Sequence, residues 1–263
     1  MSTYNPPAPL SVVDASDGRL MGTMGGDTFF VSGSSFGPSL YGSIQGAVRV
    51  TYGPMGQEDK YVATVVSMDQ DVIEVLTAEG SGGPHLWRVE VAGQVGDIIG
   101  DPATDGTSYR PPAPTDLTMF VASSDGGPDE LRTSGSQVVV ISGSEFGPDD
   151  ALATVHFGLN SRAASWANQT LERTILLAFT NCQHDPRTPH TALICSTPAG
   201  SGSGYFLRVS VDGQSASLAE PVSGLPFGYA KPVVTAVGGA GSVDANTEGG
   251  QVIRIDGVSF GPA

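Results

Sequence analysis

The chain has 263 residues, which is enough for about two domains of ordinary size, each with its own hydrophobic core. Its 36 glycines and 19 prolines make up about a fifth of the residues and only 15% are charged, a composition typical of short strands joined by many turns. The net charge is −15, and no cluster of Lys and Arg offers a phosphate-binding surface, which argues against nucleic acid as a partner.

The first part of the chain has the pattern of a β domain. Pro6-Pro7-Ala8-Pro9 opens it, and from Thr28 to Ser32 β-branched and aromatic side chains run almost unbroken and stop at Gly33. Asp69-Gln70-Asp71 has the composition of a hairpin turn between two further runs of this kind. The pattern predicts strands at residues 28–32, 47–52, 61–66 and 72–77.

The same features return in the same order, so the chain is built from repeats. A Phe-Gly-Pro signature begins at Phe36, Phe146 and Phe260, in steps of 110 and 114 residues, which is the size of one β-sandwich domain. A Val-x-Val-x-Gly-Gln motif follows at residues 89–94 and 209–214. The second copy predicts strands at residues 138–142, 154–157, 174–180, 191–195 and 205–211.

The repeats divide the chain into unit one (1–108), unit two (109–229) and the start of a third unit (230–263). No segment keeps a 3.6-residue apolar period over 12 residues, so we expect little helix. The third unit supplies only its first strands and cannot close a sandwich alone. We therefore predict an all-β protein of tandem β-sandwiches, and we expect the chain either to continue into further units or to donate these strands to another copy.

Three runs together resemble a known family. They are the Gly-Gly to Phe-Gly-Pro pattern at 249–262, the sequence Cys-Ser-Thr-Pro-Ala-Gly-Ser-Gly-Ser-Gly at 195–204, and the Val-x-Val-x-Gly-Gln motif. The set resembles the IPT/TIG domains, which are immunoglobulin-like modules shared by plexins and some transcription factors. The resemblance covers unit two almost entirely, unit one with erosion at 77–83, and unit three as its first two strands. It implies an immunoglobulin-like fold and specifies no activity.

The repeated motifs also have a physical interpretation as fold residues. We expect the Phe of each Phe-Gly-Pro signature to plug the end of a core, the Gly to allow a tight bend, and the Pro to stop further strand pairing. Gly93-Gln94 and Gly213-Gln214 are expected at two-residue hairpin turns, where Gly adopts positive φ without steric cost.

The two cysteines, Cys182 and Cys195, lie in unit two on segments that we expect to be neighbouring strands. The family pattern and an extracellular setting favour a disulfide between them, which would add about 3 kcal/mol of stability. Two alternatives remain open: a pair of free buried thiols, or a zinc site completed by His184 and His190.

Two further sites are candidates for modification. Asn168-Gln169-Thr170 is the one Asn-x-Ser/Thr sequon, so Asn168 is a candidate glycosylation site. The Pro-Pro-Ala-Pro starts are interpreted as stiff spacers between sandwiches. As an alternative, they would be exposed sites for proline hydroxylation and O-glycosylation.

No catalytic, cofactor or metal site is predicted. The chain has no Gly-x-Ser-x-Gly elbow, and no Lys-Ser/Thr follows the glycine-rich segments 22–26 and 200–204. Asp149-Asp150, with Asp125, Asp129 and Glu130 nearby in sequence, is a weaker candidate for calcium at the end of a domain. Acidic turn residues of this kind are more often simply solvated.

These observations favour a non-enzymatic, extracellular or cell-surface structural or adhesive protein that self-associates into a fibre or filament. No membrane span is expected, since no stretch approaches the roughly 18–20 apolar residues needed. The amino terminus lacks the layout of a signal peptide, so a secreted form would have lost its signal or extend beyond this sequence. The alternatives are a receptor ectodomain with a protein ligand, or accessory modules of a carbohydrate-active enzyme with a glycan ligand.

Overall fold

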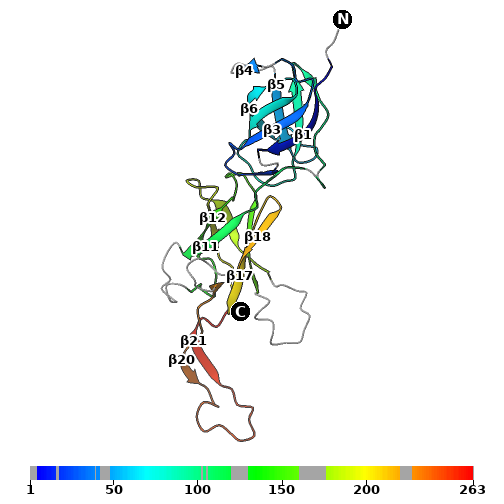
Figure 1. Ribbon diagram of the computed structural model, residues 1–263. Helices are drawn as coiled ribbons and strands as arrows, with labels where there is room; N and C mark the ends of the chain where they lie inside the picture. The colour runs from blue at the N-terminus through cyan, green and yellow to red at the C-terminus, as the bar shows by residue number, and fades with distance from the viewer. Residues whose placement is uncertain are drawn as a thin grey trace.

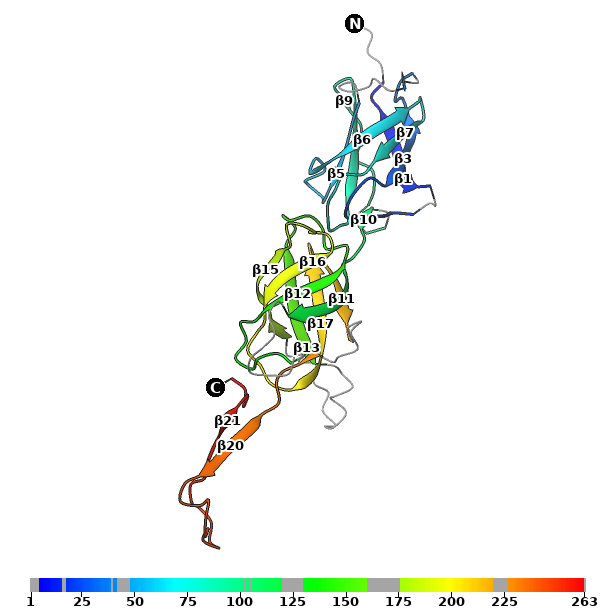
Figure 2. The same cartoon turned by 90° about the vertical axis from the view of Figure 1, so that its left-hand side faces the viewer.

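The computed structural model describes residues 5–15, 18–38, 40–41, 48–101, 103–104, 106–119, 130–159, 176–219 and 227–262. These residues form strands, turns and loops without any α-helix, and the predicted all-β class is confirmed. Figures 1 and 2 show two β units following one another along an elongated molecule, with a hairpin beyond the second. Within the described ranges there is consequently no helix long and apolar enough to cross a membrane.

Unit one is a single sheet that folds around one core. Its path runs β1-β3-β7-β6-β5-β8-β9, and the long strand β6 connects the two halves because its first residues pair with β5 and its last with β7. The short β2 and β10 pair separately. The strands are β1 (Ala8–Asp14), β2 (Leu20–Met21), β3 (Thr28–Ser34), β4 (Leu40–Tyr41), β5 (Val48–Gly53), β6 (Tyr61–Met68), β7 (Val72–Leu76), β8 (Leu86–Val91), β9 (Gln94–Val95) and β10 (Ser108–Tyr109).

Unit two consists of two sheets that share one core. One sheet has the order β11-β12-β16-β15, the other has the order β14-β13-β17-β18 with β19 on β17, and both contribute buried side chains to the same cluster. The strands are β11 (Ala113–Met119), β12 (Val138–Ser144), β13 (Ala153–Leu159), β14 (Leu176–Ala178), β15 (Thr180–His184), β16 (Ala192–Ser196), β17 (Ser203–Val211), β18 (Gln214–Leu218) and β19 (Phe227–Gly228).

The Phe-Gly-Pro signatures occupy the same place in both units. Phe36 and Phe146 are fully buried, as predicted for side chains that plug the end of a core. Each ring lies against a glycine of the preceding strand: a Cβ added at Gly33 or Gly143 would meet the ring tip at 2.6 Å. The small residue is therefore required there because ring and backbone are already in contact.

The Val-x-Gly-Gln motifs form the predicted two-residue hairpin turns. Val91 pairs with Gln94 and Val211 with Gln214, so two residues make each turn. Both turn residues have positive φ in each case: 49° and 80° at 92–93, and 42° and 85° at 212–213. These values are those of a type I′ turn, for which Asp-Gly and similar pairs are favoured.

Three details of the sequence interpretation are corrected by the structure. The Pro-rich starts are strand residues, since Ala8-Pro9 and Ala113-Pro114 begin β1 and β11 and pair with β3 and β12. The second and fourth residues of each Pro-Pro-Ala-Pro are buried, so these runs are part of the units, and the exposed setting assumed for hydroxylation does not hold for them. The side chain of Tyr109, the first residue of the predicted unit two, lies in the core of unit one.

The third correction concerns the strand predicted at 174–180. From residue 176 onwards the structure has two short strands instead, with β14 in one sheet and β15 in the other. Phe179, which lies between them, is buried, and Asn181 has a positive φ of 52°. The chain changes sheets at this point, which β-propensity alone does not reveal.

The C-terminal hairpin is formed by β20 (Val233–Gly238) and β21 (Arg254–Val258), the two strands predicted for the start of the third unit. Its signature Phe260 is 53% exposed, in contrast to the buried Phe36 and Phe146. The exposed apolar side chains of this segment are Val233, Val234, Val237, Val243, Val252, Ile253, Ile255 and Val258. The hairpin thus has the local structure of the other units without a core to bury these side chains.

The predicted pairing of the two cysteines is present in the structure. Cys182 on β15 and Cys195 on β16 form a disulfide between neighbouring antiparallel strands, with their Cα atoms 4.1 Å apart. A disulfide fits an oxidising, extracellular-type compartment. Asn168, the candidate glycosylation site, lies outside the described residues.

Candidate functional site: the junction between units one and two

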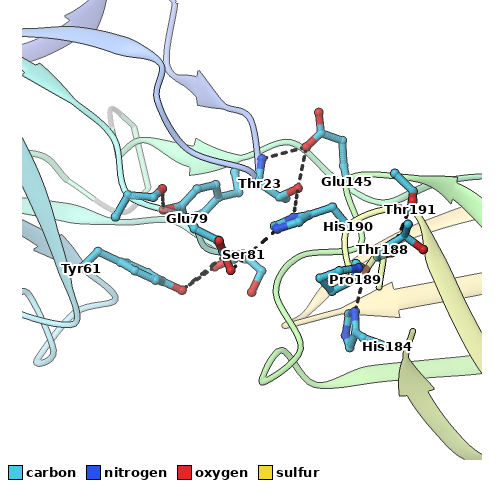
Figure 3. A network of polar contacts seen from close by, with 12 residues as sticks. Thr23, Tyr61, Glu79, Ser81, Glu145, His184, Thr188, Pro189, His190 and Thr191 are labelled. Carbon is cyan, nitrogen blue, oxygen red and sulfur yellow. Dashed lines mark hydrogen bonds and ion pairs between the residues drawn. The ribbon is translucent and has the colours of Figure 1, made fainter. Parts of the chain in front are cut away.

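The most elaborate polar arrangement in the described residues is the contact between the two units. We call the end of a unit that carries the Phe-Gly-Pro loop its head, and the opposite end its tail. The tail of unit one meets the head of unit two, and Figure 3 shows the loops from both sides converging. On the tail the contacts are made by the side chains of Thr23, Glu79 and Ser81 and by the carbonyl of Tyr109; on the head they are made by the side chains of Arg110, Glu145, His190, Asp212 and Gln214.

Thr23 and Glu145 form the centre of the junction (Figure 3). The backbone N–H and the hydroxyl of Thr23 both donate to Oε2 of Glu145, at 2.8 and 2.9 Å. Hydrogen bonds to a charged group contribute roughly 1.5–3 kcal/mol, more than neutral ones. Oε1 of the same carboxylate lies 3.6 Å from the half-exposed Arg110 guanidinium, a pair that contributes less than about 1 kcal/mol.

His190 extends this network toward a second carboxylate. Its Nδ1 lies 3.0 Å from the Thr23 hydroxyl oxygen, and its Nε2 lies 3.8 Å from Oε1 of Glu79. Because the single hydroxyl proton of Thr23 is donated to Glu145, Nδ1 of His190 must be the donor to Thr23. The ring therefore bridges two residues of unit one from a loop of unit two.

A second group of contacts lies around Ser81. Its hydroxyl donates to Oδ2 of Asp212 at 2.6 Å, and Oδ1 of that carboxylate accepts the Leu152 N–H at 3.1 Å. The side chain of Ser81 also packs on the head loop, where a Cβ at Gly147 would lie 2.9 Å from Cβ of Ser81. Gly147 has a φ of 82°, so this position favours glycine for its conformation as well as for the close approach.

The backbone of the tail is held by tyrosines. Tyr61 donates its hydroxyl to the Ser81 carbonyl at 3.2 Å, and Tyr109 donates to the Ala78 carbonyl at 2.8 Å. The Tyr109 carbonyl in turn accepts from the side-chain amide of Gln214 in unit two at 2.8 Å. These hydrogen bonds fix the backbone of the loop that contacts the next unit.

Behind this loop lies a buried histidine among aromatic rings. His85 is 1% exposed, and its ring centroid lies 5.4 Å from those of Tyr61 and Tyr109. Burial lowers the pKa of His85 to about 4, although the nearby backbone of Ser81 and Gly82 partly offsets this. Neither ring nitrogen of His85 has a hydrogen-bond partner of normal geometry, so the neutral ring contributes to the core by packing against its neighbours. Burial also raises the pKa of the neighbouring Tyr52 to about 12.

A cleft of about 360 Å³ opens beside the junction. Its lining carries charges of both signs, and the residues that line it include Lys60, Tyr61, Glu79, Asp150 and Asp212. Across the described ranges, no group of three or more His, Cys, Asp or Glu side chains gathers in a way that could hold a metal ion. The candidate calcium residue Asp150 contributes to this lining, while Asp125 and Asp129 lie outside those ranges.

The zinc alternative in unit two is contradicted by the contacts of its four residues. Cys182 and Cys195 are bonded to each other, so neither can supply a thiolate. His184 faces the backbone carbonyls of Pro189 and Ala151 with its two nitrogens, at 3.0 and 3.1 Å. His190 belongs to the junction. The zinc alternative grouped the two histidines with the cysteines, whereas the fold directs both rings to other partners.

The tail-to-head contact occurs a second time in the chain. Ser201 in unit two occupies the place of Ser81, and its carbonyl accepts the hydroxyl of Tyr205 at 2.7 Å. In the segment after the C-terminal hairpin, a Cβ at Gly261 would lie 3.2 Å from Cβ of Ser201, the counterpart of the contact between Gly147 and Ser81. The packing of a tail serine on the glycine of a Phe-Gly-Pro loop is therefore repeated in the chain.

The residues of the junction were missed by the sequence analysis. Thr23 and Glu145 are 122 positions apart, and each is a polar residue in a loop. A signal was available in the alignment of the repeats, because Glu145 stands where the other two signatures have Ser35 and Ser259. A charged residue at a position that is otherwise serine points to a contact specific to that copy.

Comparisons with known proteins add little to this picture. No family model and no curated protein matches the chain, so the IPT/TIG resemblance stays a prediction. Among solved structures, the chain is similar to a structural-genomics protein of unknown function from Bacteroides thetaiotaomicron, with 14% sequence identity and a TM-score of 0.29. That match covers 82% of this chain and 50% of the other, so the chain spans half the length of that protein. A likeness this weak carries no argument about fold or function.

Proposed function

We propose that the chain is a non-enzymatic structural or adhesive repeat protein of the extracellular space or cell surface. Its units would be tandem immunoglobulin-like β-sandwiches of the IPT/TIG type, with boundaries close to those predicted from the repeats. The protein would act as a building block of a fibre or filament, through end-to-end packing of units or through strand donation. Copies of the same chain would then be its main partners.

The observation that carries this proposal is the repeated tail-to-head contact. Ser81 packs on Gly147 between units one and two, and Ser201 packs on Gly261 in the segment that follows the C-terminal hairpin. A contact that joins two different surfaces and is repeated with the same residues extends in one direction without closing. Stacking of this kind makes a rod, and the disulfide of unit two supports an extracellular location for it.

The C-terminal hairpin supports self-association. In units one and two the corresponding strands β3 and β12 each have a second neighbour, β7 or β16, on the side away from β1 or β11. Among the described strands, β21 pairs with β20 alone, and Ile255 on it is 56% exposed. A strand from another copy added at this edge would complete the pattern and cover apolar side chains.

Electron microscopy of the purified chain at increasing concentration tests the proposal. We expect thin fibres whose axial repeat corresponds to one or two units. A variant with a charge on the hairpin, Ile255→Lys, should assemble less well than the control Thr235→Lys, which adds the same charge at an exposed polar position of β20. Dispersed monomers that bind a soluble partner would contradict the proposal.

A further inference from the structure

The head of unit one has the same local structure as the head of unit two. In unit one, the N–H of Phe36 donates to the carbonyl of Gln70, and in unit two the N–H of Phe146 donates to the carbonyl of His190. Ser35 and Glu145, which precede the two Phe residues, have almost the same positive φ, 64° and 59°. Position by position, Ser35 therefore corresponds to Glu145 and Gln70 to His190.

The turns of the Gly-Gln motifs extend this correspondence. Ala92 stands where unit two has Asp212, and Gln94 stands where unit two has Gln214, because the two hairpins have the same register. In unit two these positions bind unit one, through the Ser81 hydroxyl and the Tyr109 carbonyl. Their counterparts in unit one therefore occupy the corresponding places on its head.

The corresponding surface of unit one contains a hollow of about 520 Å³. Residues that line it include Ser35, Gly37, Gln70, Ala92 and Gln94. Each of these has a counterpart in unit two that contacts or lies beside the tail of unit one. The hollow thus matches the face that unit two uses at the junction.

The two heads differ in charge. Unit two presents Glu145, His190 and Asp212, whereas unit one presents the uncharged Ser35, Gln70 and Ala92. A serine head is already in place elsewhere in this chain: Ser259 precedes Phe260 with a φ of 60°, and that loop sits against the tail of unit two. A head of this uncharged type is therefore compatible with the repeated contact.

The distal turn of the C-terminal hairpin has the local structure of a tail. In the turn that presents Thr23, the N–H of Gly25 donates to the Gly22 carbonyl; in the hairpin, the N–H of Gly249 donates to the Asn246 carbonyl, at 3.0 Å in both. The N–H of Asn246 also donates to the side chain of Gln251, as that of Gly22 does to Asp27. Thr247 in the hairpin therefore occupies the place of Thr23, and it is exposed.

We infer that the head of unit one is a docking surface for a second copy of this chain, which inserts the distal turn of its C-terminal hairpin, residues 246–250. Thr247 of that copy would lie between Ser35 and Gln70, as Thr23 lies between Glu145 and His190 within the chain. The inference rests on the proposed function and names the surfaces by which copies join. Because head and tail are different surfaces, the contact propagates in one direction.

A gain-of-function variant tests the inference directly. Ser35→Glu places in unit one the carboxylate that binds Thr23 in unit two, at a φ that Glu145 already adopts. Sedimentation velocity of the full chain at about 0.15 M salt should show self-association that is tighter by about tenfold, since the new hydrogen bonds involve a charged acceptor. Adding Thr247→Val, which removes the hydroxyl donor, should reverse most of this gain.

A blocking variant with a matched control completes the test. Gln70→Arg introduces a long charged side chain into the docking surface and should weaken association, whereas Gln57→Arg, at an exposed glutamine distant in sequence from the head, should leave it unchanged. Assembly that persists with unchanged strength in Ser35→Glu and Gln70→Arg overturns the inference and leaves the proposed function standing. A chain that stays monomeric at every concentration, Ser35→Glu included, overturns both.

Discussion

Units one and two use the same strand pairings but stabilise them with different chemistry. Where unit one has Tyr52 paired with Trp87, unit two has Phe157 paired with Leu207. The rings of Tyr52 and Trp87 stack with their centroids 4.3 Å apart. At the position of Cys195 in unit two, which pairs with β12, unit one has the buried Val75, which pairs with β3.

The two units differ in one large ring and one covalent bond. Unit one fills its interior with large rings, which gain both from burial and from mutual contact. Unit two also has clustered rings around Phe157, but it has Leu207 in the place of the tryptophan and closes a 13-residue separation with a disulfide, for which about 3 kcal/mol is expected. The two units should therefore respond differently to the loss of a ring and to reduction.

Truncation of the tryptophan should have the largest effect. Trp87→Ala would leave a cavity in unit one and reduce its free energy of unfolding by about 3–5 kcal/mol. In a urea titration of the full chain, the transition of unit one should move to lower denaturant while that of unit two stays. The matched variant Leu207→Ala should do the reverse, and equal shifts of both transitions by either variant would show that the cores are not independent.

Loss of the disulfide should have the next largest effect and be confined to unit two. The double variant Cys182→Ala/Cys195→Val, which gives unit two the valine that unit one has at this position, should lower its free energy of unfolding by about 3 kcal/mol. Reductant should produce a similar change in the wild-type chain and none in the variant. A loss below about 1 kcal/mol would mean that the packing around Cys195 already supplies most of the stability.

A fall in pH should lower the free energy of unfolding of unit one relative to that of unit two, by less than the loss of the disulfide changes unit two. His85 has a pKa of about 4 in the folded chain and 6.5 when exposed, so the unfolded state takes up the proton first as pH falls. Its contribution to stability is complete above pH 6.5 and is lost as pH falls toward 4, with a loss of about 2 kcal/mol between pH 7 and pH 5. Unit two has Tyr205 in the corresponding place and should lack this change. Urea midpoints measured across this range should show the difference, and His85→Phe should abolish it.

Much of each unit could be predicted from the sequence because the relevant signals are local. Phe36 and Phe146 are buried as expected, and the turns at 92–93 and 212–213 follow from glycines that must adopt positive φ. The crossing between β14 and β15 was missed because both segments have similar β-propensity, and only the core decides which sheet each joins.

The junction could not be predicted in the same way. Thr23, Glu145 and Asp212 are polar loop residues, and such residues are solvated in most proteins. Their partners are distant in sequence, so the contact depends on how one unit is placed against the next. A signal for it lies in the repeat, at the position where Glu145 replaces the serine of the other two signatures.

The disulfide has a mechanical consequence if the array is pulled along its length. Tension enters a unit at one end and leaves at the other, and an unfolded segment lengthens by at most about 3.3–3.6 Å per residue. The residues between Cys182 and Cys195 cannot be drawn out, which removes roughly 40 Å of extension from unit two, while unit one can extend along its whole length. Unit two is predicted to be 13 residues longer than unit one (121 against 108), so this loss brings the two units to nearly the same maximal extension under load.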